Sequence, residues 1–139
     1  MKPLFFVLIF FVSNNMFPQS GVYIIDHTQN RSDGNILKWT LSLKEDGLFL
    51  YHFLRDISGE ANPEENFYGK GTWKVEGKIV SFSTKPSDLN DDFTVNLNNS
   101  KARYITKSPR DTSDKVVKTA LRFYQSELFY IKGLHLFKE

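Results

Sequence analysis

The sequence contains no cysteine and no marked excess of one charge, and each shortage removes a class of function. Without cysteine the chain forms no disulfide, offers no thiol nucleophile, and supplies neither a thiolate ligand for zinc nor the cysteine that anchors a lipoprotein. The 18 basic and 16 acidic side chains give a net charge of +2, too small for a surface that coats nucleic acid. We therefore expect neither thiol chemistry nor a nucleic-acid partner.

Long apolar runs are also scarce, and the one that exists lies at the N-terminus. Lys2 precedes nine consecutive apolar residues, Leu4 to Val12. As a helix these would rise about 14 Å, roughly half of a bilayer's hydrocarbon core, so a membrane-spanning anchor is not expected. A basic start and a short apolar run are typical of a secretory signal peptide, a buried strand of a cytosolic protein being the alternative. We predict a signal peptide over residues 1–19 and an exported protein, periplasmic or secreted, without a membrane span.

The remaining residues, 20–139, are predicted to form one domain rich in β-hairpins. Apolar residues recur at every second position in several stretches separated by turn residues. Residues 37–43 alternate strictly, residues 44–47 form a tight turn that ends in glycine, and residues 48–55 return as the second strand.

A second hairpin is predicted from residues 67–75 and 78–83. Its first strand carries Gly69 and Gly71 on the same face as its aromatic residues. Glycine inside a strand is typical of a sharp bend or of a close approach by another backbone. A bent strand is what a small closed barrel needs.

Beyond residue 83 the alternation weakens, and polar segments separate shorter strands. Residues 56–66 and 107–115 contain proline and acidic side chains and are predicted to be exposed loops. Weaker strands are predicted at residues 93–97, 102–107, 118–124 and 127–131, with residues 134–137 continuing the last one. A short helix at 113–121 is an open alternative, because apolar residues between 116 and 124 fall at helical spacing.

Together these segments indicate an all-β protein of about eight short antiparallel strands joined in sequence order. Such a meander removes its exposed edges most simply by closing on itself. We therefore predict a small up-and-down β-barrel.

Two hairpin motifs in the first half of the domain carry a family resemblance. They read Leu41-x-Leu43-x-x-Asp46-Gly47-x-Phe49-x-Tyr51 and then Gly71-Thr72-Trp73-x-Val75-x-Gly77. This pair, over about residues 37–83, is similar to the hairpins of the bacterial lipocalin-like families, including NlpE-like domains. The resemblance implies a small exported barrel that can hold a small apolar ligand, and it transfers no catalytic residue. Lipid anchoring and metal sensing are not implied, because they depend on cysteine motifs that this chain lacks.

Aromatic side chains are the best candidates for a binding site. If the strand register is as predicted, one end of the barrel is lined by six rings: Trp39, Phe49, Tyr51, Phe53, Phe67 and Trp73. Such an interior suits an apolar or planar ligand, although it is also what a packed core requires. We predict ligand contacts from four of them, with the Tyr51 hydroxyl orienting the ligand: Trp39, Tyr51, Phe53 and Trp73.

The sequence offers no convincing catalytic or metal site. His27, His52 and His135 fall in different predicted strands or strand edges, without the spacing of metal ligands. Residues 88–92 begin like a calcium loop, but Phe93 stands where such a loop needs glycine. A Ser-His-Asp hydrolase would need a nucleophile elbow, which is missing. We predict no catalytic residue, metal or cofactor.

The function predicted from the sequence is therefore that of a monomeric, non-enzymatic, exported barrel. Its predicted partner is a small apolar molecule or an envelope protein. The alternative is an interaction or inhibitor module that presents loops 56–66 and 107–115 to a secreted or envelope partner.

Overall fold

The protein is a closed eight-stranded β-barrel in the computed structural model, which describes residues 17–27, 34–61 and 63–139. All neighbouring strands are antiparallel and consecutive, and pairing of the first strand with the last closes the barrel. The strands are β1 (Gly21–Asp26), β2 (Ile36–Leu43), β3 (Leu48–Asp56), β4 (Glu64–Glu76), β5 (Ile79–Ser83), β6 (Ser100–Ile105), β7 (Ala120–Gln125) and β8 (His135–Lys138). The predicted all-β barrel is confirmed, whereas most of the predicted signal peptide lies outside the described residues.

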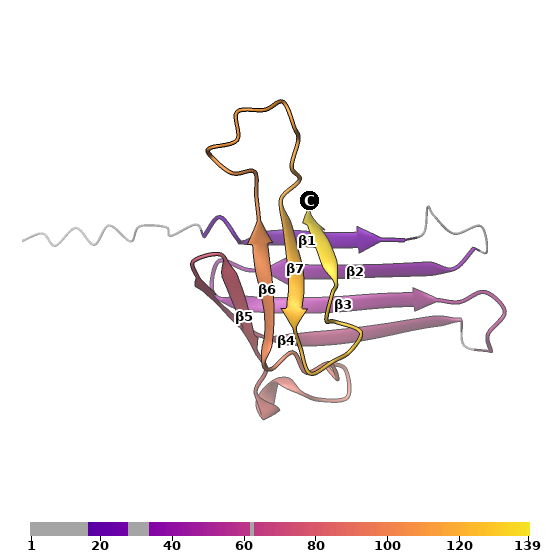
Figure 1. The fold of residues 1–139 in the computed structure, drawn as a ribbon. Helices are drawn as coiled ribbons and strands as arrows, with labels where there is room; N and C mark the ends of the chain where they lie inside the picture. Colours follow the sequence, from indigo (N-terminus) through magenta and orange to yellow (C-terminus); the bar gives the residue numbers. More distant parts are fainter. Residues whose placement is uncertain (1–16, 28–33, 62) are drawn as a thin grey trace, which may run out of the picture.

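The two halves of the barrel differ in length and direction. Figure 1 shows β1 to β4 lying side by side, with the shorter β6, β7 and β8 crossing in front of them at a steep angle. The pairing of β3 with β4 runs from Leu48 opposite Thr72 to Asp56 opposite Glu64. The end of the long sheet at which β3 connects to β4 extends past the crossing strands (Figure 1).

The interior of the barrel is filled by side chains. An eight-stranded barrel encloses a space just wide enough for this or for one small ligand. The largest side chains with almost no exposed surface are Tyr23, Tyr51, Phe49, Phe82, Phe123, Leu41, Leu97, Leu121, Ile131 and Leu136. A ligand bound inside the barrel must therefore lie at its end rather than at its centre.

The two glycines of β4 lie where other backbone comes close, as predicted. A side chain at Gly69 would place its Cβ 2.8 Å from the carbonyl oxygen of Val95. At Gly71 a Cβ would collide with the carbonyl of Ser83 and with the ring of Phe49. Glycine at both positions thus lets β4 pack tightly against the segments beside it.

Several predicted boundaries in the second half of the chain are wrong. Residues 93–97 form no strand; within this segment Phe93 alone makes a bridge, to Tyr68 of β4. Residues 127–131 belong to the connection between β7 and β8. The helix considered at 113–121 is also absent: most of that range lies in an irregular connection, and Val116 is 91% exposed. A helix there would have no apolar surface to cover its face, so helical spacing alone does not stabilise it.

The predicted loop 56–66 is shorter than expected. β3 continues to Asp56 and β4 begins at Glu64, so only the residues between them connect the strands. Arg55 forms ion pairs with Glu60 at 3.1 Å and with Glu65 at 3.3 Å, which join the charged residues across this hairpin. Cross-strand pairing of opposite charges lets polar residues extend a strand that looks like a loop in the sequence.

Residues 17–20 lie against the opposite end of the barrel, beside the β2–β3 turn. The Phe17 ring packs edge-on against Trp73, with 5.8 Å between centroids. The carbonyl of Pro18 accepts hydrogen bonds from Lys138 Nζ at 2.9 Å and from the Tyr104 hydroxyl at 3.2 Å. The carbonyl of Gln19 accepts one from the buried hydroxyl of Tyr23 at 2.6 Å.

Candidate functional site

A row of three stacked rings lines the inner face of the long sheet near its projecting end. Trp39 of β2 lies opposite Phe53 of β3, which lies opposite Phe67 of β4. The rings of Trp39 and Phe53 are stacked, with centroids 4.4 Å apart and an interplanar angle of 12°. Phe53 and Phe67 continue the stack at 5.9 Å and 20°. The alternation of β-strands brings these rings to one face, and the register places them in one row.

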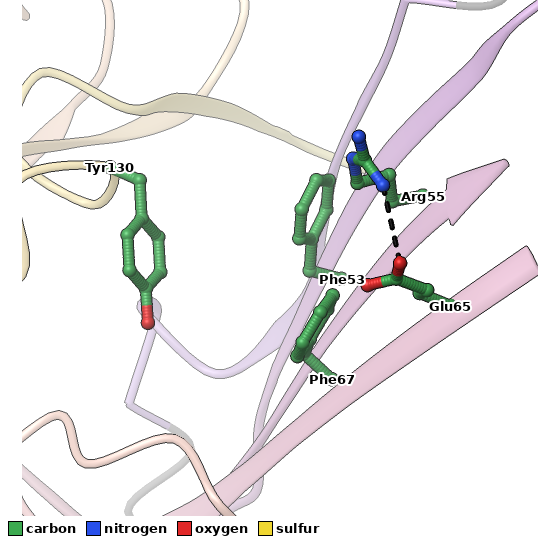
Figure 2. Close-up of a pocket in the computed structure, with 5 residues that line it drawn as sticks. All are labelled: Phe53, Arg55, Glu65, Phe67 and Tyr130. Atoms are coloured by element: carbon green, nitrogen blue, oxygen red, sulfur yellow. Dashed lines mark hydrogen bonds and ion pairs between the residues drawn. The ribbon is translucent and has the colours of Figure 1, made fainter. Parts of the chain in front are cut away.

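Tyr130, from the connection between β7 and β8, forms the other side of a cleft. Figure 2 shows its ring across an open space from Phe53 and Phe67. The neighbouring Ile131 is fully buried and its amide donates to the carbonyl of Leu128 at 3.0 Å, which fixes this part of the connection. The cleft has a volume of about 350 Å³ and is lined by Phe53, Arg55, Glu65, Phe67 and Tyr130.

Charged side chains form the outer rim of the cleft. Arg55 contacts Glu65 within the cleft (Figure 2), and its other guanidinium nitrogen contacts Glu60. The hydrogen bond to Glu60 raises the pKa of Arg55, which keeps the guanidinium charged. Two carboxylates against one guanidinium leave this rim with a net negative charge. Because the pairs are largely exposed, they orient side chains more than they stabilise the fold.

Three buried side-chain polar atoms lack hydrogen-bond partners among the described residues, and two of them lie beside the stacked rings. These two are the hydroxyl of Tyr51 and the indole nitrogen of Trp39. Burial raises the pKa of Tyr51, the nearby Tyr130 hydroxyl raises it further, and the Trp39 indole N–H lowers it. The indole N–H is thus close enough to affect the pKa of the Tyr51 hydroxyl, yet the two groups do not meet hydrogen-bond geometry. Buried donors left in this state cost about 1–3 kcal/mol each, which marks the position as unusual.

The structure brings together three of the four predicted ligand-binding residues. Trp39 and Phe53 stack on each other, and Tyr51 lies one inward-facing position deeper on β3. Trp73 is only 5% exposed and lies at the opposite end of β4, where its indole N–H donates to the carbonyl of Lys44 at 2.9 Å.

The expectation that six rings share one end of the barrel is therefore wrong. Phe49 and Phe53 are four residues apart on β3, which separates them by about 13 Å along a strand. Trp73 lies with Phe49 at the far end of this strand pair.

The charged rim of the cleft and Tyr130, which faces the stacked rings, were not among the predicted site residues. Arg55 ends the predicted strand 48–55 on the same face as Phe53, and Glu65 lies two residues before Phe67, so following the inward-facing alternation to these positions could have identified both. Tyr130 carried no such signal, because its segment was expected to be a strand rather than a connection that folds over the sheet.

The described residues contain no cluster of side chains that could hold a metal ion, since no three of their His, Asp or Glu side chains gather at one place. His52 is engaged with Asn66 at 2.8 Å and stacks on Tyr68. No helix in this part of the chain has the length and apolar character needed to cross a bilayer.

Comparison with known proteins gives no family for this chain. No protein-family model, curated protein or solved structure matches it. The fold and the cleft must therefore support any functional conclusion by themselves.

Proposed function

We propose that this protein is an exported, non-enzymatic binding protein whose ligand is a small, flat, mainly apolar molecule with one hydrogen-bond acceptor. The ligand lies in the cleft between Tyr130 and the stacked rings of Phe53 and Phe67. The observation that carries this proposal is the cleft itself, with its aromatic wall of Phe53 and Phe67 facing Tyr130. The two unpartnered donors, on Tyr51 and Trp39, are buried behind Phe53 and do not line the cleft, so the ligand's acceptor has to reach past this ring.

The shape and lining of the cleft favour a planar apolar ligand. Phe53 and Phe67 present ring faces that differ by 20°, and Tyr130 lies across the open space from them (Figure 2). A flat molecule between these walls makes ring contacts on both sides, each worth about 0.5–1.5 kcal/mol beyond the apolar area it buries. A volume of about 350 Å³ holds a molecule of two to three fused rings.

The unpartnered donors favour an acceptor on the ligand. An oxygen at the inner tip of the ligand can accept from the Tyr51 hydroxyl, the Trp39 indole N–H, or both. Satisfying a buried donor removes its desolvation cost, so the acceptor adds more affinity here than it would at an exposed site. The net negative rim, with Glu60 and Glu65 around Arg55, disfavours an anionic ligand and favours a neutral or cationic one.

A matched pair of probes tests both parts of the proposal. 2-Acetylnaphthalene and 2-ethylnaphthalene have similar size and shape, but only the ketone has an acceptor. The Trp73→Phe variant leaves Trp39 as the sole tryptophan, so its fluorescence reports on the cleft. We expect both probes to quench Trp39, with the ketone binding roughly fivefold more tightly, since one hydrogen bond contributes about 1 kcal/mol.

Variants of this background identify the contacts. Phe53→Ala and Tyr130→Ala should abolish binding of both probes, whereas Tyr51→Phe should weaken only the ketone. Tyr124→Ala is the matched control, because Tyr124 is 44% exposed, as Tyr130 is 42% exposed, and does not line the cleft. Unchanged Trp39 emission with both probes would reject the cleft. Equal affinities for the two probes would reject the acceptor while leaving the apolar site in place.

A second candidate is an interaction module, favoured by two exposed apolar side chains. Val116, in the connection that projects from the barrel between β6 and β7 (Figure 1), is 91% exposed, and Phe129 beside the cleft is 89% exposed. In this case the segment 107–115 with its neighbour Val116 contacts a secreted or envelope protein. Val116→Asp should then abolish binding of such a partner without changing probe binding in the cleft.

A further inference from the structure

Two arginines lie directly opposite each other on the outer surface of the barrel. In the pairing of β6 with β7, Arg103 faces Arg122. Side chains at directly opposite positions in an antiparallel pair have Cβ atoms only about 4.5–5.5 Å apart, and like charges placed there are destabilising. The row continues on both sides, with Ile79 of β5 opposite Arg103 and His135 of β8 opposite Arg122.

No acidic side chain neutralises this pair. Both arginines are exposed, and in the described ranges neither has an ion pair or a hydrogen bond from its guanidinium. The carboxylate that shares this row, Glu76, lies opposite Ile79, one strand further from the arginines. Lys101, also on β6, adds another positive charge two positions from Arg103. The face is therefore locally basic although the whole chain is nearly neutral.

The two arginines also line one hollow. It has a volume of about 380 Å³, and its lining consists of Ile79, Arg103, Arg122 and Tyr124. A guanidinium presents several N–H donors in a planar fork that matches the oxygens of phosphate and sulfate, and two such forks can hold one tetrahedral anion. Tyr124 offers a ring beside them.

We infer that this hollow is a binding site for a phosphate or sulfate group, held between Arg103 and Arg122. A bound dianion removes the repulsion between the two arginines, so part of its affinity comes from relieving a cost already present in the free protein. The site is on the outer face of β5 to β7 and is separate from the aromatic cleft, whose rim repels anions.

Thermal unfolding of the whole protein in phosphate or sulfate tests this site, with sodium chloride of equal ionic strength as the reference. A ligand that binds only the folded state raises the melting temperature with its concentration. Phosphate and sulfate raise the melting temperature of folded proteins in general, so the site is measured by the part of the increase that Arg103→Gln/Arg122→Gln loses. We expect both salts to stabilise the unmodified protein beyond chloride, and more than they stabilise the double variant. An equal response to all three salts would overturn the site.

Two controls make the result specific. Arg110→Gln removes one positive charge from the β6–β7 connection, outside the hollow, and should respond to phosphate like the unmodified protein. In NMR spectra of the unmodified protein, the Nε–H signals of Arg103 and Arg122 should shift with added phosphate even if the double variant folds poorly. Unmoved signals at saturating phosphate would contradict the proposal.

Comparing the affinities for inorganic phosphate and phenyl phosphate shows whether the site takes the free ion or a phosphate ester. Tighter binding of phenyl phosphate, lost in Tyr124→Ala, would assign the site to a small phosphate ester whose ring packs on Tyr124. Equal affinity would assign it to the free ion. In either case losing both arginines should weaken binding tenfold or more, about the contribution of a charged hydrogen bond.

Discussion

The contacts of residues 17–19 make a prediction about where the folded domain begins. A chain that starts at Phe17 keeps these contacts, whereas one that starts at Ser20 loses them. The two chains differ by three residues, none of which belongs to a strand. We expect the shorter chain to fold into the same barrel with a lower free energy of unfolding.

The structure sets the size of this difference. The hydroxyl of Tyr23 is fully buried and loses its acceptor, the carbonyl of Gln19, which costs about 1–3 kcal/mol unless water reaches it. The edge contact between Phe17 and Trp73 contributes about 0.5–1.5 kcal/mol. The hydrogen bonds to Pro18 are exposed and add little. The expected total is about 2–4 kcal/mol.

Urea unfolding followed by far-ultraviolet circular dichroism measures this difference. Trp73 fluorescence provides a second signal, because removing Phe17 uncovers its indole and should shift the emission to longer wavelength. Equal unfolding midpoints and equal emission maxima would refute the reasoning. If the chain that starts at Phe17 is the more stable, the folded domain begins at or before Phe17, and the predicted signal peptide would have to end before it rather than after Gln19.

Two further predictions concern the core. Gly71→Ala should lower the free energy of unfolding by about 1–3 kcal/mol, since its Cβ collides with β5 backbone; an unchanged midpoint of urea unfolding would contradict this. Burial raises the pKa values of Tyr23 and Tyr51 above their value in the unfolded chain, near 10. The folded state therefore holds these protons more tightly, so stability should be constant up to about pH 9 and fall above pH 10. The same fall in a variant with phenylalanine at both positions would contradict the assignment.

The first half of the barrel could be predicted from the sequence because its strands alternate strictly. Residues 37–55 gave the first hairpin, and the glycines at 69 and 71 indicated the close backbone approach that the structure contains. These signals are local: a period of two residues, a glycine turn, and a missing side chain where space is short. They suffice to define a hairpin without knowledge of the rest of the chain.

The second half and the cleft depended on contacts that the sequence does not display. Residues 127–131 have the composition of a strand, yet they form a connection whose buried Ile131 positions Tyr130 over the sheet. Arg55 and Glu65 extend a strand pair through charges that locally resemble a loop. The spacing of Phe49 and Phe53 along one predicted strand already placed them apart, whereas the separation of Trp73 from Trp39 follows only from the register across β2, β3 and β4.

The joint between β8 and β1 rests on few interactions. β8 has four residues, and two residue pairs join it to β1: Tyr23 with Lys138 and Ile24 with Phe137. Just beyond β8, the amide of Glu139 donates to the carbonyl of Val22 at 2.8 Å. Every other strand meets its sequence neighbour, so this is the one contact that requires the two ends of the domain to find each other. The pairing of β8 with β1 is therefore the shortest in the barrel. Transient separation of these two strands would expose their amides to exchange with solvent sooner than at any longer strand pair.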